Sequence, residues 1–558
     1  MADAAAAPKM KASLGLTGVT VNAMALIAPG AFLWITFVVQ AGYVFPSAAS
    51  MWFGIAVALL LVYATALSYA ELAKLYPGAG SSYLFAEQAF LGKARAAKFA
   101  RVAKFIIGWS SHLYYWIYPA VMVAMMGVMV GYIWGTLVPS FMNAATPGPV
   151  FMALVAVIFS FAVAWIAFRG ISGSTRVAIV INVVQIIALL FFAALAIAYR
   201  LGHPEGSTGL TLDASGNVTS AVIHYSLSDT LNISHPSALS VISPHGFSWT
   251  MLQTTIAILL LVGFESATSL GEEALNAKRD IPRAVLLSIT IQGLIMYLIE
   301  YFAANYFLNS GYGMAAAKGS AAPVGDMMRL VGNALLGGRG NAFMLLEAAT
   351  VFIALVGTTL ACINTGARVT YAMGRDKEVP EHFGMLHGEK LTPHRAIWAL
   401  AAISAVFGAY GALYYFAGPS APDQPTIAAL PHNIWYSIGF SSGHDALAKL
   451  PNSLLLITLI SNFGTFTLYG LTNIVCIVAF REHHMFSGFK HMVVPIFGAI
   501  ANFVCMAFYV IGPLEGLGSS KEPLMAVGFS VLWGLWGMFY FMKTSKQKRA
   551  MVPKAATA

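Results

Sequence analysis

Two long hydrophobic segments of this chain are interrupted near their middles by residues that disfavour a continuous membrane helix. The first interruption is residues 27–31 (IAPGA) within the segment 14–40, and the second is residues 263–266 (GFES) within the segment 249–271. Proline and glycine leave backbone groups unpaired, and hydrocarbon tolerates such groups only where the backbone lines a cavity or binds something. Paired interruptions in corresponding spans of two repeats point to the central site of a secondary transporter. The alternative interpretation is an ordinary proline kink and one tolerated glutamate.

The composition places the whole chain in a membrane. Of its 558 residues, 58% are hydrophobic and 9% are charged, whereas soluble domains carry about 25% charged residues. With about 20 apolar residues for each crossing, the sequence predicts an all-α polytopic membrane protein with twelve transmembrane helices. The predicted spans are 14–40, 49–75, 105–136, 150–167, 177–199, 249–271, 284–307, 342–370, 395–416, 453–480, 492–512 and 523–542.

The distribution of lysine and arginine predicts the orientation. If the N-terminus is cytoplasmic, only six of the 31 basic residues fall on the outer side, which agrees with the positive-inside rule. These six are Arg200, Lys318, Arg329, Arg339, Lys449 and Lys521. We therefore expect a multi-pass protein of the cytoplasmic (plasma) membrane with both termini inside. The net charge of +9 then reflects topology rather than nucleic-acid binding, and anionic lipids are the expected partners of the basic segments 93–104 and 543–554.

The expected organisation is two superimposable five-helix repeats. A cytoplasmic tail (1–13) precedes the first repeat (14–199), and an extracellular loop (200–248) leads to the second repeat (249–480). Two extra helices (481–542) and a basic cytoplasmic C-terminal tail (543–558) follow. Residues 323–336 in addition predict an amphipathic surface helix.

The sequence contains no pattern typical of an enzyme. It has no HExxH, no phosphate-binding loop and no CxxC, so we expect neither catalysis nor a bound cofactor. The three cysteines, Cys362, Cys476 and Cys505, all fall within predicted spans and do not indicate a disulfide framework.

Ionisable residues inside the spans are the candidate functional groups, because an ionisable side chain in a span costs at least about 2.5–3.5 kcal/mol. Glu265 lies near the middle of an interrupted span, and we predict that it acts in binding or transport. Its alternative role is a neutral carboxyl that is hydrogen-bonded to backbone. We expect Glu300 and Glu347 to reach interfacial water, and His112 to be packed and hydrogen-bonded.

The two interruptions have complementary electrostatics. The half-helix that begins after Pro29 and Gly30 presents free N–H groups and a positive dipole end, which suit a substrate carboxylate. Freed carbonyls at residues 262–264, together with Glu265, suit an ammonium group. Such a site fits a zwitterion, and no lysine or arginine lies at mid-depth in the spans.

Three motifs carry a family resemblance. Residues 68–83 (SYAELAKLYPGAGSSY) resemble the inner end of the second span of the amino acid–polyamine–organocation transporters. Residues 263–284 resemble the sixth span of that superfamily and the loop after it. Residues 364–380, followed by Thr392-Pro393-His394, resemble its eighth-span exit and ninth-span start. The matches occur in the expected order and, taken together, extend over most of residues 14–543.

The resemblance implies a five-plus-five inverted-repeat fold of the leucine-transporter type, with the last two helices outside the core. It also implies a substrate site between spans 1, 3, 6, 8 and 10. The matching candidates are Ile27, Ala28, Pro29, Gly30, Ala31, Tyr118, Val262, Gly263, Phe264 and Glu265. The family has a backbone donor where this chain has Pro29, which leaves Gly30 and Ala31 as donors to a carboxylate.

The sequence leaves three interpretations of how transport is coupled to an ion. Some proton-coupled relatives carry a lysine in the fifth span, but this chain has Ala188 near that position. Glu265 could instead take up and release H⁺, or Thr358 and Thr359 could help to hold Na⁺, since they match a hydroxyl pair of sodium-coupled relatives. Exchange without an ion is the third interpretation.

The sequence as a whole predicts a permease for amino acids that works by alternating access, with a neutral or cationic substrate, by symport or exchange. One alternative is a transporter of polyamines or other organic cations with the same fold. Another is a substrate sensor or channel that retains the fold without active transport.

Overall fold

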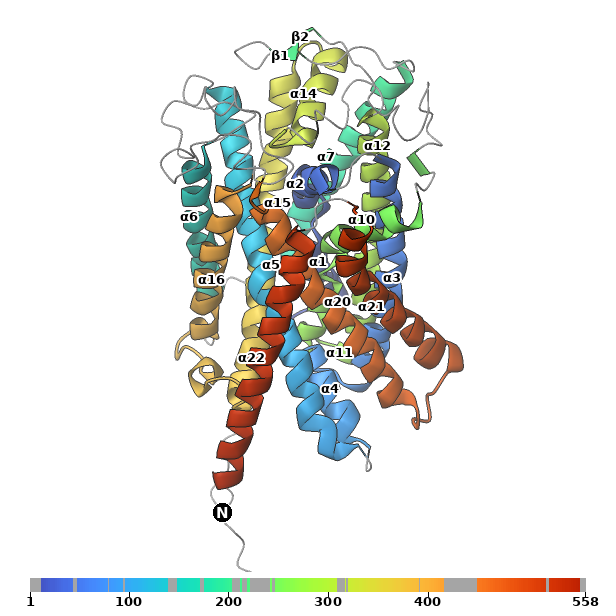
Figure 1. Cartoon of the computed structure of the whole chain (residues 1–558), viewed down its shortest axis with the longest axis vertical. Helices are drawn as coiled ribbons and strands as arrows, with labels where there is room; N and C mark the ends of the chain where they lie inside the picture. Colours follow the sequence, from blue (N-terminus) through green and yellow to red (C-terminus); the bar gives the residue numbers. More distant parts are fainter. Residues whose placement is uncertain are drawn as a thin grey trace, which may run out of the picture.

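The computed structural model describes residues 12–43, 48–78, 80–93, 96–138, 148–170, 175–202, 211–212, 218–220, 241–242, 246–308, 317, 320–390, 392–415, 449–517 and 521–551. Helices form one elongated bundle in these residues (Figure 1). A small antiparallel ribbon pairs β1 (Thr211–Leu212) with β2 (Val218–Ser220). The predicted tail 1–13, loop 200–248 and tail 543–558 lie largely outside the described residues.

Eleven helices among the described residues are long and apolar enough to cross a membrane. They comprise α3 (Ala48–Leu75), α5 (Ala100–Leu137), α6 (Pro149–Phe168), α7 (Thr175–Gly202), α10 (Phe247–Leu261) with η2 (Phe264–Leu270), α11 (Ala277–Ser288) with η3 (Ile289–Tyr297) and α12 (Leu298–Leu308), α15 (Gly340–Arg375), α16 (His394–Leu413), α20 (Ser453–Phe480), η6 (Phe489–Val493) with α21 (Val494–Leu514), and α22 (Lys521–Met551). The first predicted span, 14–40, is instead two short helices, α1 (Leu16–Ile27) and α2 (Pro29–Tyr43).

Helix boundaries follow from local chemistry. Proline occupies the first turn of α6 and of α14 (Pro323–Leu335), where its missing N–H costs no helical bond. At the start of α20, the Asn452 side chain accepts a hydrogen bond from the Leu455 N–H. The helix α14 confirms the amphipathic helix predicted for residues 323–336, and it packs with its apolar face buried.

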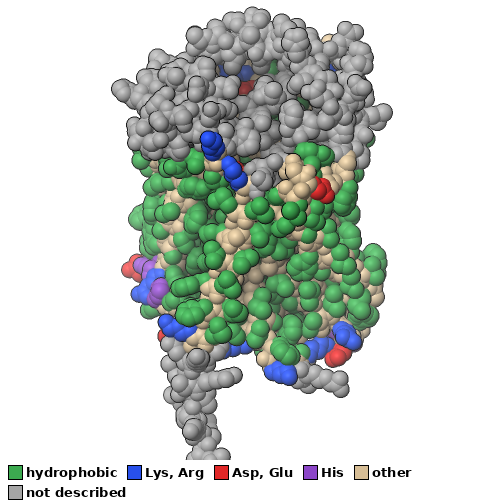
Figure 2. Space-filling view, in the orientation of Figure 1, with side chains coloured by type: hydrophobic (Ala, Val, Ile, Leu, Met, Phe, Trp, Pro, Cys, Tyr) green, Lys and Arg blue, Asp and Glu red, His purple; other side chains and the backbone are tan. Residues whose placement is uncertain are grey.

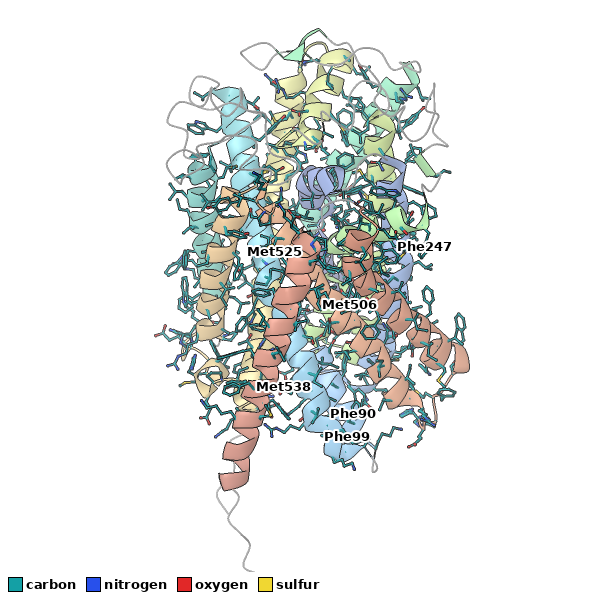
Figure 3. All side chains as sticks on the ribbon, viewed as in Figure 1. Phe90, Phe99, Phe247, Met506, Met525 and Met538 are labelled. Atoms are coloured by element: carbon teal, nitrogen blue, oxygen red, sulfur yellow. The ribbon has the colours of Figure 1, made fainter. Side chains whose placement is uncertain are left out.

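The helices differ strongly in burial. The segment α10–η2 is mostly enclosed, whereas α22 is mostly exposed along its apolar length. On α22, Met525 and Met538 are 45% and 55% exposed (Figure 3). Hydrophobic side chains cover the middle of this face, and lysine and arginine gather at its lower edge (Figure 2). This pattern is that of a lipid-facing belt around a packed centre.

Shorter helices mark the two ends of the bundle. The lower end, as drawn in Figure 1, carries α4 (Ser82–Leu91), and the upper end carries α14. Helices α1, α2 and α10 meet between these ends. The breaks in the predicted spans therefore lie at the middle of the bundle, where a site can form.

Candidate substrate site

The first break separates α1 from α2 at one residue. Ala28 has a φ of 25°, and Pro29 then starts α2 with no N–H to offer. The carbonyls left without helical donors are bonded from neighbouring helices. The Tyr297 hydroxyl of η3 donates to the Ile27 carbonyl at 2.6 Å, and the Thr358 hydroxyl of α15 donates to the Ala25 carbonyl at 2.8 Å.

One expected donor of this break is already engaged. The Ala31 N–H donates to the Ala28 carbonyl at 3.1 Å, so it is not free to bind a substrate carboxylate. Among the described residues, the Gly30 N–H has no backbone acceptor. The prediction of two free donors at residues 30 and 31 is therefore wrong for Ala31.

The second break separates α10 from η2, and it contacts the first break. Gly263 has a φ of 127°, a conformation that glycine adopts without the strain of a side chain. A Cβ at this position would lie 2.9 Å from the Leu26 side chain and 3.0 Å from the Leu26 carbonyl carbon. The Gly263 carbonyl accepts hydrogen bonds from the backbone and the hydroxyl of Ser266, so it is not available to an ammonium.

Glu265 is completely buried and bonds its own break. Its Oε2 accepts from the Gly263 N–H at 2.9 Å and from the Tyr469 hydroxyl of α20 at 2.7 Å. Its Oε1 accepts from the Tyr115 hydroxyl of α5 at 3.2 Å. Three donors compensate for burial of the carboxylate, which joins η2 to two other helices.

An aromatic cluster surrounds this carboxylate. The rings of Tyr69, Phe264 and Tyr469 pack against one another with centroids 5.3–5.9 Å apart. Tyr118 is buried, and its hydroxyl donates to the Leu259 carbonyl of α10 at 3.3 Å. Sequence reasoning missed Tyr69, Tyr115 and Tyr469, because tyrosines within apolar spans give no signal that distinguishes site from core.

A cavity of about 270 Å³ lies beside the first break. It is formed by α1, α7, η2 and α15, and it extends from Ala28 to the segment that precedes α1. Its polar lining consists of Ser13, Asn22, Asn182, Gln185, Ser266, Ser269, Glu273, Asn364, Thr365 and Arg368. Of the ten predicted substrate-binding residues, Ala28 lines this cavity, and Glu265 points instead into the aromatic cluster.

Gln185 of α7 connects the cavity to the first break. It is 2% exposed, and its Oε1 has no hydrogen-bond partner among the described residues. A Cβ on Gly30 would lie 3.0 Å from its Cγ. Gln185 of α7 therefore lies at the first break. Its signal in the sequence was an amide, like that of Asn182, within an apolar span.

The two candidate coupling hydroxyls have different environments. The Thr358 hydroxyl is bonded to the Ala25 and Ala354 carbonyls, whereas the buried Thr359 hydroxyl has no partner among the described residues. His112 is packed against Trp116 and lies 3.2 Å from the Thr370 hydroxyl, which confirms its predicted packing. The expectation for Glu300 and Glu347 is wrong, since they are 0% and 1% exposed.

The lower end of the cavity is crossed by an ion pair. Arg368 of α15 lies 2.6 Å from Glu273, which follows η2. The backbone of Glu273 in turn accepts from the Ser13 and Leu14 N–H groups at 2.9 Å. These contacts tie the start of α1, the end of η2 and α15 together at this end of the cavity.

A second polar network lies nearby, between α4, α5 and the end of α15. Lys104 contacts Glu87 at 2.6 Å and Asp376 at 2.9 Å, and the Tyr83 hydroxyl donates to Asp376 at 2.8 Å. Burial and the neighbouring charge of Asp376 raise the pKa of Tyr83, so its hydroxyl keeps its proton.

Two meeting helix breaks beside a solute-sized cavity are typical of membrane transport proteins, and sequence comparison agrees. The family model described as amino acid permease matches residues 13–536, so the chain belongs to this family. It is thus a multi-pass transporter of that family rather than an enzyme, as the sequence motifs predicted.

The relatives that it resembles carry different substrates. The low-affinity putrescine importer PlaP of Escherichia coli strain K12 is 24% identical over 506 residues, which cover 89% of this chain and 87% of that protein. The branched-chain amino acid permease BcaP of Bacillus subtilis strain 168 is 26% identical over 368 residues, which cover 63% of this chain and 65% of that protein. The BcaP protein of Lactococcus lactis is also 26% identical, over 64% of this chain and 68% of its own length.

Proposed function

We propose that this protein is a secondary active transporter that moves neutral or cationic amino acids across the cytoplasmic membrane by alternating access. One observation carries the proposal: the two helix breaks contact each other at Leu26 and Gly263, directly above a cavity of about 270 Å³. That volume is just below the about 300–1,000 Å³ range of small-molecule pockets. It suits one small solute.

The proposed architecture is a five-plus-five inverted repeat with twelve crossings. The first repeat runs from the α1–α2 pair to α7, the second from α10–η2 to α20, and α21 and α22 lie outside. The lower end in Figure 1 is proposed to be cytoplasmic, because Lys and Arg gather there (Figure 2). The cavity then opens toward the cytoplasm, with the Arg368–Glu273 pair as its inner gate.

The chemistry of the cavity favours a solute without excess negative charge. Its charged lining residues among those described, Glu273 and Arg368, are paired with each other. Near the break, the polar groups are the Gly30 N–H and the Gln185 and Asn22 amides, which suit a carboxylate and an ammonium of one zwitterion. We propose Glu265 as the anion that fixes the geometry of the second break, on which substrate binding and transport depend.

The residues around the two breaks allow two alternative coupling ions, H⁺ and Na⁺. Uptake of H⁺ would convert the Glu265 carboxylate, which accepts three hydrogen bonds, into a neutral carboxylic acid. Alternatively, Na⁺ would bind the Ala25 carbonyl and the Thr358 and Thr359 hydroxyls, since sodium prefers oxygen ligands. Exchange of one amino acid for another needs neither ion.

Uptake into proteoliposomes tests this proposal. The purified full chain should give saturable uptake of a neutral or cationic amino acid, and an excess of unlabelled substrate should inhibit it. Glutamate should compete at least about tenfold more weakly, since a second carboxylate needs a cationic partner. Saturable glutamate uptake at micromolar KM that neutral amino acids leave unaffected would refute the charge argument.

A polyamine or organic cation is the second candidate substrate. It is favoured by the likeness to PlaP over 89% of the chain and by the buried Glu265, Glu300 and Glu347. Uptake of putrescine that amino acids do not inhibit would favour this alternative. Substrate-induced thermal stabilisation without any flux would indicate a sensor, and flux that does not saturate would indicate a channel.

A further inference from the structure

A second acidic site lies in the upper half of the bundle, away from the cavity. Glu300 of α12 and Glu347 of α15 are 0% and 1% exposed. All four of their carboxyl oxygens lack a hydrogen-bond partner among the described residues. The buried Tyr301 hydroxyl beside Glu300 also lacks one in this part of the structure.

The basic residues of the surrounding helices are directed elsewhere. The Arg200 guanidinium of α7 lies over the Tyr306 ring at 5.3 Å. Arg329 of α14 donates to the Asn341 side chain at 2.9 Å.

The other ionisable groups around Glu300 and Glu347 also make hydrogen bonds to other residues. Asp326 of α14 accepts hydrogen bonds from the hydroxyls of Tyr132 and Ser320. Tyr297 donates to the Ile27 carbonyl. The pair therefore has no described cation, and two ionised carboxylates there would be costly in hydrocarbon.

We infer that Glu300 and Glu347 are proton-binding groups that take up H⁺ from the side of the membrane opposite to the cavity and couple it to transport. A carboxyl that is buried without a hydrogen-bond partner is less costly as the neutral acid than as the ion, because the ion loses its hydration. Uptake converts a carboxylate to a carboxylic acid, and release returns the same proton to water. The inference deepens the proposed function, on which its coupling role rests, by naming the ion and its site.

Helix geometry links this pair to the first break. Glu300 lies three residues after Tyr297, about one helical turn, in the continuous η3–α12 segment. Tyr297 holds the Ile27 carbonyl at 2.6 Å. A change of charge at Glu300 that shifts α12 would move this donor, and with it the upper end of α1.

The test uses the full-length protein in proteoliposomes with the variants Glu300→Gln, Glu347→Gln and the double variant. Glu515→Gln is the matched control, because Glu515 is an exposed carboxylate just after α21. Accumulation driven by an inward H⁺ gradient should fall at least tenfold in the buried-site variants. Counterflow without a gradient should remain within about threefold of wild type, and the control should behave as wild type.

Infrared spectroscopy provides a readout that does not require transport. The wild type should show a carboxylic acid C=O band that titrates with pH and weakens in both buried-site variants. If wild type shows the band but no flux of any solute, the proton site stands and the proposed transport function fails. Absence of the band, gradient-driven accumulation that the variants retain, or accumulation in wild type driven by Na⁺ alone would overturn the inference. Loss of counterflow together with accumulation in a folded variant would also overturn it, since this would indicate a structural or substrate-binding role.

Discussion

At the α1–α2 break, the freed carbonyls of Ala25 and Ile27 are bonded by Thr358 and Tyr297, which belong to other helices. At the α10–η2 break, Glu265 instead bonds the Gly263 N–H two residues before it. The second break is therefore stabilised within its own segment, although two tyrosines add bonds from outside. The first break depends on its neighbours for its geometry.

This difference assigns different mechanical roles to the two breaks. A break held by its own residues keeps its shape when surrounding helices move, so η2 is suited to act as a fixed platform. A break held from η3 and α15 changes when either helix moves relative to α1. Alternating access requires such relative motion, and we expect the α1–α2 break to be the part that responds.

The largest effect should come from Glu265→Gln, which weakens the internal bonding of the second break. The amide keeps the shape but loses the charge that three donors stabilise, and a hydrogen bond to a charged group contributes about 1.5–3 kcal/mol. Uptake should fall by at least about a hundredfold, since two such bonds together are worth that factor. Uptake assays on folded protein check this.

The control for this variant is Glu515→Gln, whose carboxylate is exposed. Tyr469→Phe should show a larger defect than Tyr115→Phe, because the Tyr469 bond to Glu265 is 2.7 Å and the Tyr115 bond is 3.2 Å. Wild-type uptake and an unchanged pH profile in Glu265→Gln would contradict the role of this carboxylate.

The next largest effects are expected from substitutions of the glycines at the two breaks. Gly263→Ala places a Cβ 2.9 Å from Leu26 at a φ of 127°, and such backbone strain alone costs about 1–3 kcal/mol. It should lower the thermal unfolding temperature and the yield of folded protein. Gly30→Val should change apo stability less, because a Cβ at Gly30 meets the outer part of the Gln185 side chain at 3.0–3.3 Å and not backbone, but it should remove substrate binding.

Thermal unfolding and substrate-induced stabilisation, measured on both variants, distinguish these outcomes. If Gly30→Val binds substrate normally and Gly263→Ala unfolds at the wild-type temperature, neither break has the tight geometry described above. Gly528→Ala of α22 is a suitable control, since Gly528 is exposed and a Cβ at that position meets no other atom within 4 Å.

A smaller effect is expected from Tyr297→Phe, which removes the donor to Ile27 without changing the ring. A neutral hydrogen bond contributes about 0.5–1.5 kcal/mol. Because this bond joins α1 to η3, its loss should change the rate of exchange several-fold more than the substrate affinity. Counterflow kinetics together with binding measurements test this, and an affinity change without a rate change would argue against a responsive first break.

Much of the fold could be predicted from composition. The predicted limits of the later spans lie close to the helices, as for 453–480 and α20 (Ser453–Phe480), because each crossing needs a long apolar run. The positions of both breaks were also predictable, since Pro29 and Gly263 disfavour a continuous helix. The packing of the breaks against each other depends on tertiary contacts that no local pattern encodes.

The candidate site was harder to predict. Glu265 was identifiable as a lone acid in an apolar span, but the direction of its side chain, toward tyrosines and away from the cavity, follows from helix rotation. Gln185 was not predicted, because an amide in an apolar span gives the same signal at a binding site as in a packed core. The burial of Glu300 and Glu347 was missed because their nearness to the span ends suggested contact with water.

The smallest expected effect concerns Pro29→Ser, which adds one backbone N–H at the first break. Proline at the first helical position loses no helical bond, so the substitution should be tolerated. The new donor would lie beside the Gly30 N–H, and the Ala31 N–H stays engaged with Ala28. If the substrate carboxylate binds here, affinity should increase by no more than the about 1.5–3 kcal/mol of one charge-assisted bond, less any cost of helix re-forming across Ala28. Isothermal titration of the wild type and the variant measures this difference. A tighter complex with unchanged apo stability would place the substrate carboxylate at the first break. Identical affinity of wild type and Pro29→Ser, together with normal transport by Gly30→Val, would instead mean that α1–α2 is merely kinked and that the substrate binds elsewhere.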